Sequence, residues 1–185
     1  KKIRTLAEKN RLHDELHRQT AHQIDLLNSW LKRLIDTDNH EEKKELLRRI
    51  VVVGAYLKRR NNLILVNEQD GIIKTEELKL SLNEMMKNLQ LANISCACAV
   101  QFEDDIPSNI AMQLFDFYEY VVENTFDGLT SLLARFFHRD GSYFACIDVV
   151  CSLDLTNLKK ENLTVSVSEE NCYTLSFQVK EGDGK

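Results

Sequence analysis

The spacing of apolar residues divides the chain into a helical first part and a mixed second part. From residue 2 to about residue 35, apolar side chains recur every three or four positions, which places one apolar stripe along a long helix. A polar turn at 36–42 leads to a second amphipathic helix that ends near residue 66. The stripe of the first helix comprises Leu16, Ile24, Leu27, Leu31 and Leu34, and that of the second comprises Leu47, Ile50, Gly54, Leu57, Asn61 and Ile64.

Two long amphipathic helices joined by a short polar turn predict an antiparallel hairpin. A hairpin alone leaves half of each apolar stripe uncovered. Pairing two copies of the hairpin into a four-helix bundle buries both stripes, so the pattern also predicts a homodimer.

The pattern changes after a linker at 67–71. The expected elements are a short strand at 72–73, a helix at about 76–91, a β-like stretch at 95–103, a helix at about 108–126, and two hairpins made by the stretches around HRDG and EEN. The Asp140-Gly141 step is a strong signal for the first hairpin turn. This order predicts an α+β domain in which an α/β sandwich places helices on one face of a sheet.

Composition and charge support a folded chain with two domains. The 185 residues are 43% apolar, which is enough for a packed core, and the net charge of −5 gives no case for a nucleic-acid partner. The charge is unevenly distributed, because residues 1–68 carry 15 basic and 10 acidic groups (+5) and residues 69–185 carry 9 and 19 (−10). This asymmetry predicts one domain at 1–68 and another at 69–185.

The cysteines and the absence of long apolar runs indicate a reducing, aqueous setting. The five cysteines are odd in number and form no CxxC pair, so we expect reduced thiols in a cytoplasmic protein. No run approaches the roughly 18 apolar residues of a membrane span, and no signal-peptide pattern opens the chain. Because the chain begins at Lys1 without Met, a membrane sensor domain could precede it.

The first candidate for chemistry is His13, which directly precedes Asp14 on the first helix. A neutral imidazole nitrogen can accept a phosphoryl group, and an adjacent carboxylate can take or orient the other ring proton. The same residues also allow a surface pair, with Asp14 bound to Arg18 one helical turn later. His13 and His17 are also four residues apart, a spacing that can place two imidazoles on one metal.

The second candidate is the pair Glu123 and Asn124 near the end of a predicted helix. Carboxylate and amide oxygens there can hold Mg²⁺ that bridges nucleotide phosphates, or they form the polar edge of an ordinary helix. A basic cluster on the second helix, Lys58, Arg59 and Arg60, can receive an acidic partner or a membrane surface, or form the solvated face of a bundle.

Taken in order, HDEL on the first helix, its helical partner, a linker, and strand-helix-strand-helix ending in VVEN resemble the transmitter region of a bacterial two-component sensor histidine kinase. The resemblance is to the group with an HDxLG phosphoacceptor helix followed by a Bergerat-type ATPase domain, and it covers nearly the whole chain in element order. It implies that His13 is the phosphoacceptor and that Asp14 is its acid-base neighbour. It also implies that Asn124 binds Mg²⁺ in the nucleotide site, with Glu123 beside it.

The resemblance further implies that ATP with Mg²⁺ donates a phosphoryl group to His13 in a homodimer, and that a response-regulator Asp receives it. The chain departs from the family near both motifs. His17 and Arg18 stand where Gly and Gln are usual, and Asp127 and Gly128 stand where Lys and His often follow the second motif.

The largest departure lies after the first hairpin, where the family has a DxGxG motif and a flexible, Gly-rich ATP lid. Here the strand ends VVCSLDLTNLKKEN, and only about ten residues, Leu153 to Asn162, connect the two hairpins. The nearest carboxylates are Asp148 and Asp154. The resemblance therefore implies a degenerate ATPase-like domain without a recognisable lid. Two functions follow, a kinase transmitter and a catalytically inactive dimeric scaffold or phosphorelay protein.

Overall fold

The computed structural model describes the backbone of residues 2–67 and 71–181, and the side chains of 14, 18, 20–65 and 71–181. The described chain divides into two compact units, Lys1–Asn61 and Asn62–Lys185. The first two helices are α1 (Lys2–Asp36) and α2 (His40–Asn67), as the sequence periodicity predicts. No helix among the described residues is long and apolar enough to cross a membrane, and all five cysteines are free thiols.

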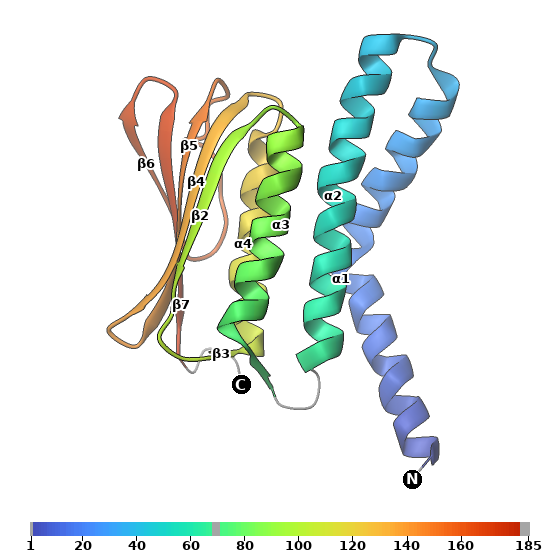
Figure 1. Ribbon diagram of the computed structural model, residues 1–185, viewed down its shortest axis with the longest axis vertical. Helices are drawn as coiled ribbons and strands as arrows, with labels where there is room; N and C mark the ends of the chain where they lie inside the picture. The colour runs from blue at the N-terminus through green and yellow to red at the C-terminus, as the bar shows by residue number, and fades with distance from the viewer. Residues whose placement is uncertain (1, 68–70, 182–185) are drawn as a thin grey trace. The chain divides into compact units, whose positions relative to one another are not determined.

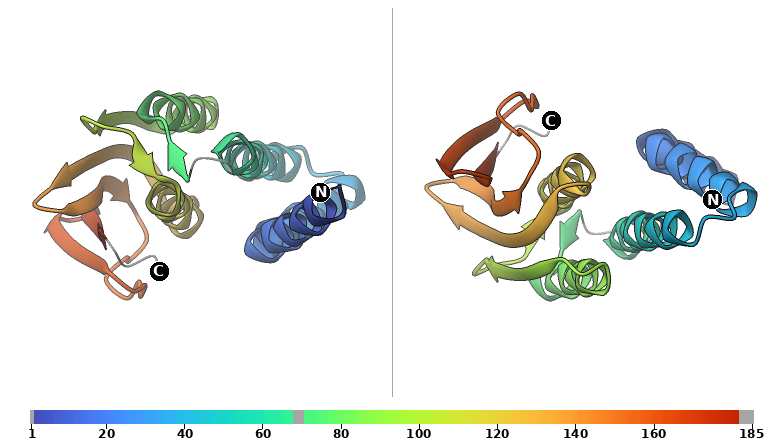
Figure 2. Two further views of the ribbon diagram at one scale, coloured as in Figure 1. Left: turned by 90° about the horizontal axis from the view of Figure 1, so that it is seen from below. Right: turned by 90° about the horizontal axis from the view of Figure 1, so that it is seen from above.

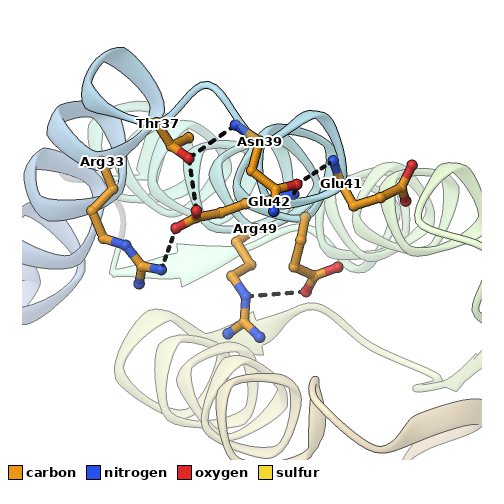
Figure 3. A network of polar contacts seen from close by, with 7 residues as sticks. Arg33, Thr37, Asn39, Glu41, Glu42 and Arg49 are labelled. Atoms are coloured by element: carbon orange, nitrogen blue, oxygen red, sulfur yellow. Dashed lines mark hydrogen bonds and ion pairs between the residues drawn. The ribbon is translucent and has the colours of Figure 1, made fainter.

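The turn between α1 and α2 is held by a polar network (Figure 3). Asn39 caps α2, because its Oδ1 accepts hydrogen bonds from the backbone N–H groups of Glu41 and Glu42 at 3.0 and 3.2 Å. The Glu42 carboxylate in turn accepts hydrogen bonds from Arg33 and Thr37, each at 2.7 Å. These bonds lower the pKa of Glu42 and join the end of α1 to the start of α2.

Beyond the turn, α2 returns beside α1 (Figure 1). The Arg49 guanidinium of α2 lies 5.9 Å from the centre of the Trp30 ring of α1, within cation–π range. Parts of the predicted apolar stripes remain exposed to solvent in a single chain, since Leu31 and Leu47 are exposed. The dimeric four-helix bundle therefore stays a prediction.

The second unit is a five-stranded sheet with two helices on one face (Figures 1 and 2). Its elements are β1 (Ile72–Ile73), α3 (Thr75–Leu91), β2 (Ser95–Gln101), β3 (Ile106–Pro107), α4 (Ser108–Thr125), β4 (Leu129–Arg139), β5 (Ser142–Cys151), β6 (Leu163–Glu169) and β7 (Cys172–Lys180). The sheet order is β2-β4-β5-β7-β6. Only β2 and β4 run parallel, and the other neighbours are antiparallel. The predicted α+β class is confirmed.

The helices pack on the sheet through the apolar positions that the sequence predicts. The fully buried side chains include Leu78, Leu82, Met85 and Leu89 of α3 and Leu114, Phe117 and Val121 of α4. The Phe117 ring stacks on Phe177 of β7 with 4.7 Å between ring centres. This contact joins α4 to β7, the strand between the central β5 and the edge strand β6.

The hairpin turns also form where the sequence predicts them. Asp140 and Gly141 have φ angles of 51° and 70°, the two positive values that a type I′ turn requires. At the second turn Asn171 has a φ of 63°, a conformation that asparagine tolerates better than most residues. The two turns set the register of β4 with β5 and of β6 with β7.

A second, two-stranded sheet was not predicted. The segment Ile106–Pro107, directly before the expected helix, forms strand β3, which pairs antiparallel with Ile72–Ile73 of β1. Thr75 reinforces this pairing, because its N–H donates to Asp105 Oδ1 and its hydroxyl donates to the Asp104 carbonyl. The two short strands and these bonds thereby hold the first turn of α3 to the segment that precedes α4.

We predict that Phe117→Ala lowers the free energy of unfolding by about 3–5 kcal/mol, because it leaves a cavity between α4 and the sheet. Phe144→Ala is the matched control, since Phe144 stacks on Phe137 on the partly exposed opposite face, at 5.1 Å. Urea unfolding followed by circular dichroism should show a clearly smaller loss for the control. Equal losses would contradict the central role of the Phe117 contact.

Candidate functional site

The HDEL motif lies within the continuous helix α1. Asp14 and Arg18 are exposed. The side chains of His13 and His17 lie outside the described residues, so the phosphoacceptor role of His13 and the alternative two-histidine metal site stay predictions. Within the described part of the chain, no group of three His, Cys, Asp or Glu residues could hold a metal ion.

The VVEN motif forms the last turn of α4. The Asn124 side chain is half-buried, and its Nδ2 donates a 2.7 Å hydrogen bond to the Tyr120 carbonyl one turn earlier. This bond fixes the amide orientation, and no described side chain or backbone group donates to Asn124 Oδ1. An amide oxygen held in this way fits one coordination position of Mg²⁺. Glu123 lies beside it, also half-buried.

The end of β5 closes directly onto the end of α4. Cys151 is fully buried, its Sγ lies 3.6 Å from the Thr125 carbonyl, and burial raises the pKa of the thiol. Ser152 N–H donates to the Gly128 carbonyl at 3.0 Å, and a Cβ at Gly128 would lie 2.5 Å from Ser152 Oγ. Gly128 therefore serves a close approach between two chain segments. The Cys151 thiol, packed against the end of α4, therefore stands at the end of β5. A thiol cannot do the work of the carboxylate that binds adenine in the kinases of the resembled family.

The two nearest carboxylates are bound elsewhere. Asp148 lies on the sheet face away from the helices, where it pairs with Arg135 at 2.7 Å and accepts the Thr174 hydroxyl at 2.6 Å. Asp154 accepts hydrogen bonds from both the hydroxyl and the N–H of Thr156, and these bonds lower its pKa. Neither carboxylate replaces the missing motif, so the residues present do not fit an adenine site of the family type.

Residues 152–162, here called the connecting segment, join β5 to β6 and are fastened to the rest of the second unit. The Leu155 side chain is almost completely buried. The Tyr120 hydroxyl donates to the Lys159 carbonyl at 3.3 Å, and the Lys160 ammonium lies 4.9 Å from the centre of the Tyr120 ring. Tyr120 is one helical turn before Asn124, so the connecting segment lies against α4 close to the VVEN motif.

Sequence reasoning missed Glu119, a carboxyl group inside α4. It is 1% exposed, and neither of its oxygens has a hydrogen-bond partner among the described residues. Burial raises its pKa well above the usual value, and the nearby charges of Glu123 and Asp116 raise it further. The signal in the sequence is its place within the largely apolar run from Phe117 to Val122. The geometry indicates a neutral acid one turn before the VVEN carboxylate.

Glu119 should make stability depend on pH. Because its pKa is raised in the folded state, its stabilising effect is complete below the ordinary pKa and is lost as pH rises toward the folded pKa. We predict that Glu119→Gln flattens this decline and raises the free energy of unfolding at neutral pH. Urea unfolding across a pH series measures the effect, with Glu76→Gln on the exposed side of α3 as control. An unchanged pH slope in Glu119→Gln would contradict the prediction.

No model of a protein family matches the chain, and no curated protein matches it in sequence. Among solved structures, a bacterial phosphotransferase is similar at 12% identity and a TM-score of 0.46, with 92% of this chain and 95% of that chain covered. The Acinetobacter baumannii histidine kinase AdeS is similar at 11% identity and a TM-score of 0.42, covering 90% and 98%. The histidine kinase domain of the Erythrobacter litoralis EL346 blue-light activated histidine kinase is similar at 13% identity and a TM-score of 0.44, covering 86% and 94%. The neighbours are thus histidine kinase and phosphotransferase domains, and the roles of particular residues must be argued from the chain itself.

Proposed function

We propose that this chain is a histidine-kinase-like transmitter in which His13 carries a phosphoryl group and passes it to an aspartate of a response regulator. The observation that carries the proposal is the combination, in one chain, of an HDEL helix with a sheet-packed helix that ends in VVEN. Within VVEN, Asn124 is the residue whose geometry best suits a binding role, because the bond to the Tyr120 carbonyl orients its amide.

The chemistry requires a neutral imidazole nitrogen at His13. That nitrogen attacks phosphorus, a P–N bond forms, and the P–O bond to the donor breaks with the leaving oxygen keeping the electron pair. Asp14 orients the ring or takes its other proton. ATP, when bound, would supply the phosphoryl group, and Asn124 Oδ1 would hold its Mg²⁺. Transfer of this kind depends on positioning and charge stabilisation.

A second candidate is a phosphorelay or scaffold protein that receives phosphate from a phosphorylated regulator. The connecting segment favours it, because its contacts with Tyr120 replace a flexible lid by a fixed segment. The closure of Cys151 onto Thr125 favours it as well, because no carboxylate is available to recognise adenine there.

We predict that radiolabel from ATP or from a phosphorylated response regulator reaches the wild-type chain and is lost in His13→Gln. The exposed His40→Gln at the start of α2 is the matched control and should keep the label. Label that persists in His13→Gln would remove His13 from the mechanism.

Calorimetric titration with ATP and Mg²⁺ separates the two candidates. Because the adenine-binding carboxylate and the lid are missing, we expect weak binding or none, with label arriving only from the regulator. Micromolar affinity that falls in Asn124→Ala would favour the kinase. Asn157→Ala in the connecting segment, an exposed position, is the control for that comparison.

The helical unit supports a homodimer. Four large apolar side chains near the α1–α2 turn are exposed, namely Leu31, Ile35, Leu47 and Val51, with Ile35 at 81%. They form two i,i+4 pairs, one on each helix, and each pair lies on one helix face. Exposed apolar surface of this kind marks an association site.

We predict that Leu31→Lys with Ile35→Lys converts a dimer to a monomer, because the charges would be buried without partners at the bundle interface. Sedimentation equilibrium measures the mass. Leu80→Lys on α3, also exposed, should leave it unchanged. A wild-type chain that is monomeric at all concentrations would refute the bundle.

A further inference from the structure

The two edges of the five-stranded sheet differ. Strands β2 and β6 form the edges. One backbone group of β2 is already engaged by α3, since the Gln90 side-chain amide donates to the Cys96 carbonyl at 3.2 Å. An edge whose backbone groups are engaged in this way is a poor template for a further strand.

The β6 edge has no such protection among the described residues. The Ser166 and Ser168 hydroxyls both lie toward β7, where they reach the carbonyls of Thr174 and Cys172 at 3.5 and 3.4 Å. Residues 163–168 contain no charge, proline or glycine, the devices that natural edge strands commonly use against pairing. Figure 1 shows β6 at the outer border of the sheet. Its outer backbone groups are therefore available to another strand, apart from Leu163 N–H, which donates to the Lys160 carbonyl at 3.2 Å.

The edge also offers apolar side chains. Val165 and Val167 pair with Leu175 and Tyr173 of β7, so they lie on the sheet face that carries the helices. Val165 is only half-buried and Val167 is 53% exposed. A second strand beside β6 would cover both valines.

The charges at the two ends of β6 select the partner and its direction. Lys159, Lys160 and Glu161 precede the strand with a net charge of +1, and Glu169 and Glu170 end it with −2. When β6 lies antiparallel to another β6, each positive end faces a negative end. Parallel pairing would instead place like charges together, which is destabilising.

We propose that β6 pairs antiparallel with β6 of a second copy, so that two five-stranded sheets become one continuous sheet. The bulge after Val167 limits regular pairing to residues 163–167. This contact is smaller than the roughly 1,200–2,000 Å² of a standard stable interface, so the association is weak and depends on concentration. The contact is separate from the proposed helical homodimer and from phosphate chemistry.

Complementary charge variants test the pairing. Lys159→Glu makes both flanks of β6 negative, while Glu169→Lys with Glu170→Lys makes both positive; Lys160 stays in its contact with Tyr120. Each variant alone should lose the concentration-dependent rise in weight-average mass that the wild type shows in sedimentation velocity. An equimolar mixture should recover it, up to twofold above the separate variants, because each flank again faces the opposite charge.

Two further variants complete the test. Glu103→Lys with Asp104→Lys changes the net charge by the same amount as Glu169→Lys with Glu170→Lys, at exposed positions away from β6, and it should associate like the wild type. Val167→Lys places a charge within the edge and should abolish the rise, with circular dichroism confirming the fold. The proposal is overturned if the mixture is no heavier than its components, as expected for an edge that binds another protein's extended segment. It is also overturned if the Glu103 and Asp104 variant loses association equally. Both comparisons are made relative to the separate variants, so they hold whether or not the helices dimerise.

Discussion

The packing of α4 on the sheet is the contact on which the rest of the second unit depends. The stack of Phe117 on Phe177 fixes the rotation of α4 about its axis. With that rotation set, the helix buries Glu119 and places Tyr120 against the connecting segment. The same rotation leaves Asn124 half-buried at the helix end, where its amide can be both oriented and reached. A helix turned by one residue would lose all three arrangements together.

Elements with a regular period or a local turn signal could be predicted from the sequence. The inward faces of α3 and α4 follow from helical spacing, and the Asp140-Gly141 turn follows from backbone preferences at two adjacent residues. The β1–β3 pair could not be found in this way, because strands of two residues have no period and their partners are far apart in the sequence, as in the pairing of Ile72 with Pro107. Its stability comes from tertiary contacts such as those of Thr75 with Asp104 and Asp105.

The candidate site likewise contains features that the sequence predicts and features that only the structure shows. HDEL and VVEN are local motifs, and the missing glycines after β5 are visible in the sequence. The packing of the connecting segment is not visible in the sequence, because it depends on contacts of Tyr120 with Lys159 and Lys160, about forty residues later. Glu119 escaped notice for a related reason. Helical spacing marks which apolar positions face inward, and only the packed helix shows that a carboxyl group between them is buried as well.

The short connecting segment links the two proposals physically. A long, flexible lid would leave the start of β6 free to move, and the charges before the strand would be spread over many positions. Here the contact of Tyr120 with Lys159 and Lys160 fixes that end of β6 to α4. This anchor therefore also holds the positive flank of β6 in a defined position. The connecting segment thereby contributes to a sheet edge with one basic and one acidic end, which is the arrangement that antiparallel self-pairing requires.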